Sequence, residues 1–293
     1  MGAARGGGRP GGSTMPERVR ITVLVDNARC RDDLATEHGL ALWIEADGER
    51  ILFDTGAGAA LLPNAERLNI PLARASAIAL SHGHYDHTGA LAAALALAPG
   101  ARIYAHPESR LARHSLHPGA PPRPIGIPAD AAEALARAGD RVAWTSSPVR
   151  LSDHVGLTGP IPRTRAFEDT GGPFFLDAAG ARPDPIADDQ ALWIHTAGGP
   201  VVVLGCAHAG VINTMEAVAA QAGSRAVYGI LGGMHLLRAT RERLEATAAA
   251  IERSGVRRLA PCHCTGDEAV AFLRARLPGR VETCGAGAVF DFP

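Results

Sequence analysis

The 293-residue sequence contains no lysine, and all 29 of its basic residues are arginine. Two classes of enzyme site are therefore excluded, because a Schiff base needs a lysine amine and a P-loop needs a lysine to reach the nucleotide phosphates. The arginines are balanced by 30 acidic residues, which leaves a net charge of −1. This balance provides no general attraction to phosphate backbones or anionic membranes, so we expect neither nucleic acid nor a membrane as partner.

Long apolar stretches are missing as well. The apolar run ALAAALALA at 90–98 is too short to span a bilayer and ends at Pro99-Gly100. The Gly-rich start lacks an apolar core, so we predict a disordered tail over 1–17 rather than a signal peptide, with Met15 as an alternative start. The cysteine count, five, is odd in a long chain, which argues against disulfides and favours a cytoplasmic protein.

Strand-like and helix-like stretches alternate along the chain, which predicts a single mixed α/β domain over 18–293. We predict strands at 19–27, 40–46, 50–56, 77–82, 102–106, 226–231, 258–263 and 281–292, short strands near 142–159, and a hairpin at 190–206. We predict helices at 59–69, 89–98 (capped by Thr88), 129–139, 212–222, 238–254 and 267–277. The Pro- and Gly-rich middle, 107–190, indicates an irregular elaboration that acts as a lid or substrate-binding region.

Polar side chains follow several of the predicted strands, at the points where the strands end. They are Asp54, His82, His208, His235 and His263. In layered α/β folds, the ends of strands are where binding and catalytic sites are built. We therefore expect these side chains to converge in one cleft.

The densest cluster of such residues lies in the stretch SHGHYDHTGAL. Residues two apart in an extended segment project to the same side, so His82 and His84 can bind one metal ion, and Gly83 allows a tight path between them. Asp86 and His87 then reach a neighbouring position where a second ion can bind. Imidazole and carboxylate ligands suit zinc, with iron or manganese as alternatives, so we predict one or two divalent ions.

Four stretches resemble motifs of the metallo-β-lactamase superfamily, in the family's order: LFDTG, LSHGHYDHTGAL, GCAHAGVINT and PCHCTG. The resemblance covers nearly the whole chain from about residue 19. It implies an α/β fold of four αββα layers, with metal ions at the edge between the two sheets. The ligands it implies are His82, His84 and His208 for one ion, and Asp86, His87 and His263 for the second. It also implies that Asp54 orients a ligand histidine through that residue's other ring nitrogen.

A closer resemblance is to one subgroup, the dihydropterin-methyl-(ribofuranosyl)aminobenzene-phosphate synthases. The stretches that carry it are EHGLALWIE, NAERLNI, GPIPRTRAFED, DDQAL and GGMHLL. This resemblance implies an enzyme that acts on a small phosphorylated or diphosphate-bearing substrate. In the subgroup's reaction a dihydropterin-methyl diphosphate loses its diphosphate and the ribosyl-aminobenzene partner is alkylated, so the metals would chiefly grip the leaving group.

Two other functions fit the same ligand set. In a hydrolase of phosphoesters, (thio)esters or lactones, metal-activated water would attack the substrate while Asp86 holds that water. In a sensor the ion would bind without turnover, but nearly all the ligands are in place, so an enzyme is favoured. The sequence identifies neither the substrate nor the oligomeric state.

One position departs from the superfamily pattern. Many members carry an aspartate there that bridges the two metals, whereas this chain has GILGGMH, with His235 near that position. An imidazole cannot bridge as a carboxylate does. Three readings stay open: His235 ligates one metal, it faces the substrate, or the second ion binds weakly. Asp86 and His235 are the residues that we predict to be catalytic.

Other polar residues are candidates for substrate contacts. Arg163 and Arg165 in GPIPRTRAFED are predicted to bind substrate phosphate, because a guanidinium presents a planar fork to phosphate; the alternative is that they are solvated loop residues. Asp188, Asp189 and Gln190 are predicted to shape a turn before the hairpin, although the subgroup resemblance also favours a functional role.

Three cysteines lie beside predicted ligands: Cys206, Cys262 and Cys264. In an extended chain, Cys262 and Cys264 point opposite to His263, and the spacing does not match a zinc ribbon. We therefore predict that these cysteines are small buried side chains near the site and not a structural zinc site.

Overall fold

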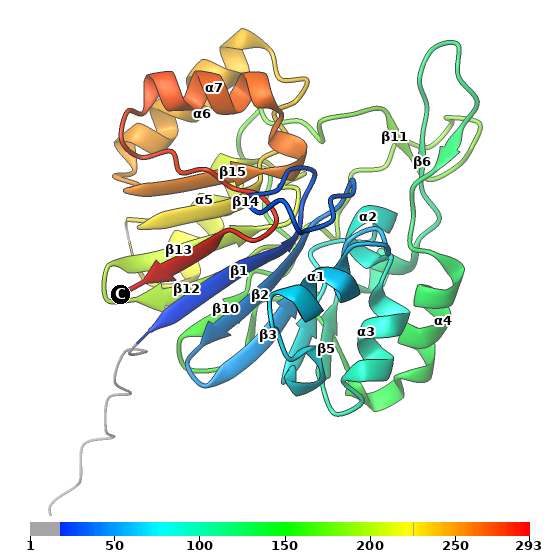
Figure 1. Cartoon of the computed structure of the whole chain (residues 1–293). Helices are drawn as coiled ribbons and strands as arrows, with labels where there is room; N and C mark the ends of the chain where they lie inside the picture. The colour runs from blue at the N-terminus through cyan, green and yellow to red at the C-terminus, as the bar shows by residue number, and fades with distance from the viewer. Residues whose placement is uncertain (1–17, 225) are drawn as a thin grey trace, which may run out of the picture.

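The computed structural model describes residues 18–224 and 226–293, so the predicted tail at 1–17 lies outside the described residues. Two β-sheets pack face to face, and helices cover the outer face of each sheet (Figure 1). The predicted αββα arrangement is therefore confirmed.

The first sheet has seven strands in the order β16-β1-β2-β3-β4-β5-β8. Their bounds are β1 (Val19–Val25), β2 (Ala41–Ala46), β3 (Glu49–Phe53), β4 (Ala77–Ala79), β5 (Arg102–Ala105), β8 (Val142–Trp144) and β16 (Val289–Phe292). The strands from β3 to β8 run parallel, so β3 and β4 have their carboxyl ends at the same edge of the sheet. β16 pairs with β1, which places the C-terminal strand beside the first described strand (Figure 1).

The second sheet has six strands in the order β15-β14-β13-β12-β10-β9. Their bounds are β9 (Val149–Arg150), β10 (Val155–Leu157), β12 (Leu192–Thr196), β13 (Gly199–Leu204), β14 (Gly229–Gly233) and β15 (Arg258–Cys262). β12 and β13 form the predicted antiparallel hairpin. β13, β14 and β15 are parallel, so their carboxyl ends also share one edge.

The predicted elaboration at 107–190 divides into two parts. One part supplies β8, β9 and β10 to the two large sheets, together with a helix that covers the first sheet. The other part contains a separate three-stranded sheet made of β6 (His114–Ser115), β7 (Arg123–Pro124) and β11 (Phe174–Phe175). In Figure 1 this small sheet stands apart from the sandwich as an arm.

Helices of the first half of the chain pack on the first sheet, and those of the second half pack on the second sheet (Figure 1). The α-helices are α1 (Leu61–Arg67), α2 (Tyr85–Thr88), α3 (Leu91–Leu97), α4 (Ala129–Arg137), α5 (Val211–Gln221), α6 (Arg241–Arg253) and α7 (Asp267–Arg276). The 3₁₀ turns are η1 (Leu72–Arg74), η2 (Pro107–Arg110), η3 (Gly139–Arg141) and η4 (His263–Thr265).

The strands alternate between two cores, because successive side chains of a strand point to opposite faces. In β2, Leu42 and Ile44 lie in the core between the sheets, whereas Trp43 lies in the core under the helices. β12 repeats this pattern on the other sheet, with Trp193 on its helix side. Both sheets are therefore buried on both faces, as a four-layer fold requires.

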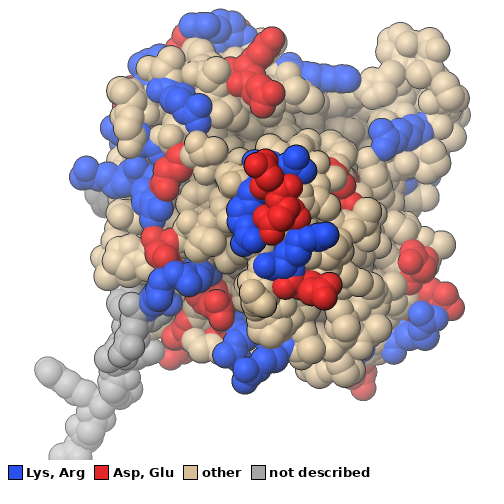
Figure 2. Space-filling view, in the orientation of Figure 1, with Lys and Arg blue, Asp and Glu red and all other residues tan. Residues whose placement is uncertain are grey.

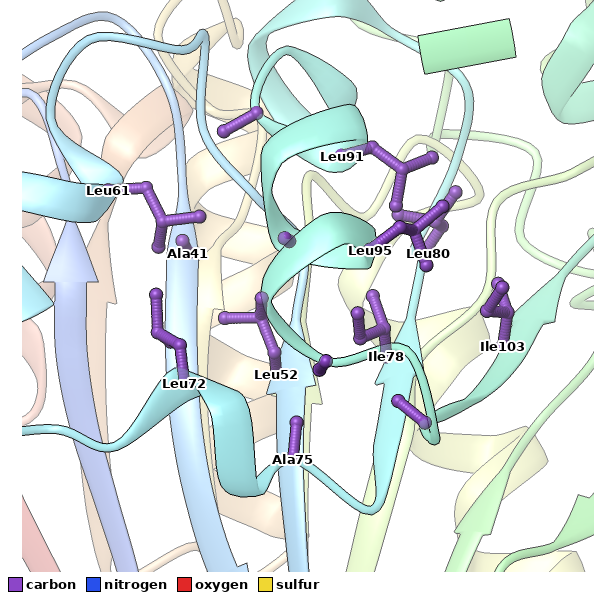
Figure 3. Close-up of a cluster of buried hydrophobic side chains, with 14 of the residues drawn as sticks. Ala41, Leu52, Leu61, Leu72, Ala75, Ile78, Leu80, Leu91, Leu95 and Ile103 are labelled. Carbon is purple, nitrogen blue, oxygen red and sulfur yellow. The ribbon is translucent and has the colours of Figure 1, made fainter. Parts of the chain in front are cut away.

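Helix α3 holds the segment after β4 against the first sheet. Leu91 and Leu95 are one helical turn apart and lie over Ile78 and Leu80 in one buried cluster (Figure 3). This apolar contact anchors the C-terminal side of the His- and Asp-rich stretch, because α3 begins directly after it.

Two local predictions are wrong. The last strand covers Val289–Phe292 and not 281–292, because Gly287 adopts a φ of +90°, which an extended strand does not allow. Thr88 does not cap α3. It ends α2, where its hydroxyl donates to the carbonyl of His84 at 2.8 Å, and Ala90 occupies the N-cap of α3 without a side-chain bond.

Acidic and basic side chains are interspersed on the face shown in Figure 2, and no broad basic region covers it. Within the described residues, no helix combines the length and apolar character needed to cross a membrane.

Candidate metal centre

The loops after β3, β4, β13, β14 and β15 bring the predicted residues to one edge of the sandwich. Their backbone is strained there. Seven described residues other than glycine have a positive φ, and four of them follow these strands: Asp54, Ala207, His235 and His263. Such conformations are costly for L-residues and concentrate at functional sites, where the surrounding packing maintains them.

Gly83 lets the chain turn tightly between two predicted ligands. A Cβ at this position would lie 2.1 Å from the backbone oxygen of Ser109 in η2, so only glycine fits. The Gly83 N–H donates to Asp188 Oδ2 at 2.8 Å. Arg113 in turn pairs through both outer guanidinium nitrogens with the Asp188 carboxylate, at 2.9 and 2.6 Å. The predicted turn residue Asp188 therefore supports the loop between His82 and His84.

His82, His84 and His208 form the first group of candidate ligands. One ring nitrogen from each lies within 4.8 Å of the others, and all three side chains are buried. His208 Nδ1 donates to the Thr170 carbonyl at 2.8 Å, which leaves its Nε2 as the atom with a free lone pair. The Nε2 atoms of His84 and His208 are buried without a hydrogen-bond partner in the described chain.

Asp86, His87 and His263 form the second group. The two histidine Nε2 atoms are 3.2 Å apart, and Asp86 Oδ2 lies 3.4 Å from His263 Nε2 and 3.8 Å from His87 Nε2. Asn27 Oδ1 accepts from His263 Nδ1 at 3.0 Å, so the Nε2 lone pair faces the group. His38 lies 3.2 Å from Asp86 Oδ2 at the solvent side of this group.

Asp54 occupies the position expected of an orienting acid. Its Oδ2 accepts from His87 Nδ1 at 2.7 Å, and this bond directs His87 Nε2 toward the second group. Ser81 donates to both carboxylate oxygens, through its backbone N–H and its hydroxyl, each at 2.7 Å. The carboxylate is fully buried and satisfied by these bonds, so its geometry is fixed.

Burial keeps most of these imidazoles neutral. It lowers the pKa of His84 to about 3 and that of His263 to about 4, and it lowers the pKa of His82 and His208 well below the usual value. His87 behaves differently. Burial also disfavours its charged form, but the charges of Asp54 and Asp86 outweigh this and raise its pKa to about 9. Neutral imidazoles have a lone pair available for a metal at neutral pH.

The two groups fit divalent transition-metal ions. Buried ring nitrogens without hydrogen-bond partners are costly unless something satisfies them, and Nε2 of His208 is such an atom. In the same group, Nδ1 of His84 lies 3.0 Å from Nε2 of His82. Imidazole and carboxylate are the ligands expected for zinc, iron or manganese. The chain therefore has the residues needed to hold such ions at this edge.

His235 lies beside the ligand groups but outside them. Its ring centroid is 4.4 Å from that of His208, and its Nδ1 is buried without a hydrogen-bond partner among the described residues. Burial lowers its pKa to about 4. His235 also lines the neighbouring cavity, so the geometry favours a substrate-facing role for this residue.

The predicted phosphate contacts Arg163 and Arg165 do not reach the cluster. Arg163 donates to the carbonyls of His208 at 2.6 Å and Pro185 at 2.5 Å, so its guanidinium buttresses two loops. Arg165 pairs with Glu216 beside a different cavity, between α5 and α6. Neither arginine lines the cavity that contains the histidines, and a role in phosphate binding there is not supported by this geometry.

Cys264 does not point away from His263 as predicted. The chain does not continue as a strand after Cys262, because His263 has a φ of +52° and begins η4. As a result Cys264 Sγ lies within 4.8 Å of ligand atoms of Cys206 and His263. Cys206 and Cys264 are both buried at the cluster, and Cys206 Sγ is 3.1 Å from His87 Nε2.

A cavity of about 280 Å³ opens beside the cluster. Two arginines that the sequence analysis missed line it, Arg123 from β7 and Arg238 from the loop before α6. Arg123 donates to the Tyr85 hydroxyl at 2.5 Å and lies over its ring, and Arg238 contacts His117 Nδ1 at 3.4 Å. Arg238 directly follows the stretch GGMHLL, so its position beside a subgroup motif could have indicated a place at the site. Nothing in the local sequence indicates that Arg123 reaches the site.

A family model described as the metallo-beta-lactamase superfamily matches residues 35–215. The chain belongs to this superfamily. It is therefore a metallo-β-lactamase-type enzyme, and the expected family fold is confirmed. The match includes the stretch from His82 to His87 and ends after His208.

One curated relative is similar along nearly the whole chain. It is the 7,8-dihydropterin-6-methyl-4-(beta-D-ribofuranosyl)-aminobenzene-5'-phosphate synthase of Methanocaldococcus jannaschii, which is 28% identical over 94% of this chain and 97% of its own length. The sequence resemblance to that subgroup is therefore confirmed.

Two solved structures share the fold. Tm1679, described as a metal-dependent hydrolase of the beta-lactamase superfamily, has a TM-score of 0.79 and 29% identity, with 93% of this chain and 98% of that chain covered. The metallo-beta-lactamase fold protein YhfI from Bacillus subtilis has a TM-score of 0.55 and 14% identity, with coverages of 94% and 99%. The relative and the first structure carry names for different reactions, so fold alone does not select the chemistry.

Proposed function

We propose that this chain is a metal-dependent transferase that joins a dihydropterin-methyl diphosphate to a ribofuranosyl-aminobenzene phosphate. The observation that carries the proposal is the cavity, whose lining combines the histidine and aspartate cluster with Arg123 and Arg238. Within the described residues, neither arginine forms an ion pair with a carboxylate. Such a lining suits reactants that carry phosphate in two places, and the similarity to the M. jannaschii synthase supports this choice.

In the proposed reaction, the C–O bond between the pterin methylene and the diphosphate breaks, and the diphosphate leaves with the electron pair. The amino nitrogen of the aminobenzene supplies the pair for the new C–N bond, and its displaced proton passes to solvent. A bound divalent ion would supply positive charge where the leaving diphosphate becomes more negative.

The chain's own residues hold and orient the reactants. His82, His84 and His208 would hold one ion, and Asp86, His87 and His263 the other, with zinc as the proposed metal. Phe174 and Tyr85 line the cavity and would provide aromatic surface for contact with the flat rings of the reactants. Arg123 and Arg238 would bind the phosphate that stays on the product.

Product analysis with and without the acceptor tests this function. The zinc-loaded chain is incubated with the pterin diphosphate, with and without the ribofuranosyl-aminobenzene phosphate, and diphosphate and coupled product are quantified. We expect diphosphate release that requires the acceptor and equals the amount of coupled product. The His84→Ala variant and chelator-treated protein serve as inactive controls. Equal release without acceptor would mean that water is the nucleophile and would assign the chain to the hydrolases instead.

A further inference from the structure

The thiol of Cys206 lies at the junction between the two ligand groups. Its Sγ is 3.1 Å from Nε2 of His87, and it lies within 4.8 Å of ligand atoms of His82 in the first group and His263 in the second. The side chain is only 3% exposed, although it lines the cavity. Cys206 lies in the loop after β13, two residues beyond the end of the strand. The next residue, Ala207, has a φ of +53°.

The other acidic or basic residues of the centre do not occupy this junction. A carboxylate oxygen of Asp86 lies within 4.8 Å of ring nitrogens of His38 and His263. Among the described residues, no set of ligand atoms that close together includes Asp86 with His84 or His208. His235 offers a single lone pair at a time, so it cannot join two ions. A thiolate sulfur has several lone pairs and is a strong ligand for zinc, iron and cobalt.

We propose that Cys206 binds metal as a thiolate and is the ligand shared by the two ions. It thereby takes the place of the bridging carboxylate that the chain lacks. The thiol proton is displaced to solvent when the Sγ–metal bond forms, so charge and atoms balance. The buried, unpartnered Nε2 of His208 is independent evidence that the surrounding pocket is built for an ion. The proposal rests on the metal centre of the proposed function but not on the transfer reaction.

Cys264 provides a matched control within the same pocket. It is also buried and belongs to the same grouping of Cys206 and His263, but its Sγ accepts the backbone N–H of His235 at 3.3 Å and points toward the Cys206 carbonyl at 3.7 Å. Its contacts therefore give it a structural task that Cys206 lacks. Cys30, which is exposed, controls for cobalt bound to a surface thiol.

Cobalt spectroscopy tests the proposal without any substrate. Metal is removed from the full-length protein, Co²⁺ is titrated in, and the near-ultraviolet thiolate-to-cobalt charge-transfer band is recorded together with bound metal. We expect the band in the wild type and in the Cys264→Ser and Cys30→Ser variants, and its loss in Cys206→Ser. Bound cobalt should fall from about two ions per chain toward one in Cys206→Ser, and Cys206→Asp should restore the second ion without the band.

X-ray absorption on the wild-type zinc protein tests the proposal even if the Cys206→Ser variant does not fold. A sulfur neighbour at about 2.3 Å from zinc is expected, and it should persist in Cys264→Ser. Two bound ions without any sulfur neighbour, a band that survives in Cys206→Ser, or a band that disappears only in Cys264→Ser would each overturn the proposal. Sulfur ligation in a protein that lacks synthase activity would overturn only the proposed reaction, whereas failure to bind any metal would overturn both.

Discussion

Oδ2 of Asp54 lies 2.7 Å from Nδ1 of His87, and neither side chain has exposed surface. The aspartate lies in the loop after β3, and the histidine lies in α2, which follows β4. The bond therefore connects the segments that follow two neighbouring strands of the first sheet. Its effect is directional, because a histidine whose Nδ1 donates to a carboxylate must present Nε2 to whatever lies on its other side.

Asp54→Asn should weaken metal binding in the second group. The amide cannot accept the Nδ1 proton and the two Ser81 bonds in the same way, so His87 loses its orientation and its negative partner. We expect a loss of about 10–100-fold in affinity for the weaker-bound ion, measured by competition with a chromophoric chelator. Ser81→Ala removes the hydroxyl contacts to Asp54 and to His82 Nδ1 but keeps the bond between Asp54 and His87, so it should weaken the second group less. Unchanged affinity in Asp54→Asn would show that His87 is not a ligand.

Arg123→Gln and Arg238→Gln should weaken binding of the substrate phosphate. Removing a charged hydrogen bond costs roughly 1.5–3 kcal/mol, so we expect KM for the phosphorylated acceptor to rise by about 10–100-fold in each variant. The same variants should have little effect on an acceptor that ends in a hydroxyl. Arg137→Gln, on the exposed pair with Glu133 in α4, is the matched control. Equal losses with both acceptors would assign the arginines to another task.

Arg113→Met should destabilise the fold. Arg113 is fully buried and pairs with Asp184 at 2.7 Å and with Asp188 at 2.6 Å, so its removal leaves two buried carboxylates uncompensated. We expect the free energy of unfolding in urea to fall by about 3–5 kcal/mol. Arg165→Gln breaks an exposed pair that solvent screens, and it should change stability far less. If Arg113→Met were no more destabilising than Arg165→Gln, the two buried carboxylates would be taking up protons or water without penalty.

Asp26 should make stability depend on pH. Burial raises its pKa to about 6, above the value of about 3.9 in an unfolded chain. The folded state therefore binds more protons than the unfolded state between these values, so the contribution of Asp26 to stability falls as pH rises through this window and is constant above it. Asp26→Asn removes this term, and metal-free variant and wild type should diverge by on the order of 2–3 kcal/mol between pH 4 and pH 7. Parallel pH profiles would contradict the raised pKa.

The fold and half of the site could be predicted because their signals are local. Leu42, Trp43 and Ile44 point alternately to the two faces of the sheet, as in any strand that is buried on both sides. The spacing of His82, His84, Asp86 and His87 fits a loop that follows a buried strand. His208 and His263 were found by their positions after strands, although their distances to the cluster depend on how the two sheets pack.

The rest could not be predicted because it depends on turns and on the arm. Cys264 was placed wrongly since nothing in the sequence shows that His263 adopts a positive φ and starts a 3₁₀ turn. Arg163 lies in a quoted motif, yet two backbone carbonyls hold it away from the cavity. Arg123 reaches the cavity only because β7 belongs to the small sheet that stands beside it.

The candidate metal ligands are divided between the two halves of the sandwich. His82, His84, Asp86 and His87 follow a strand of the first sheet, and His208 and His263 follow strands of the second. A metal ion held by both sets would link the two sheets at this edge, and neither half of the chain could bind it in the same way alone. Because such an ion would bind the folded chain and not the unfolded one, we expect the melting temperature to rise with free metal concentration.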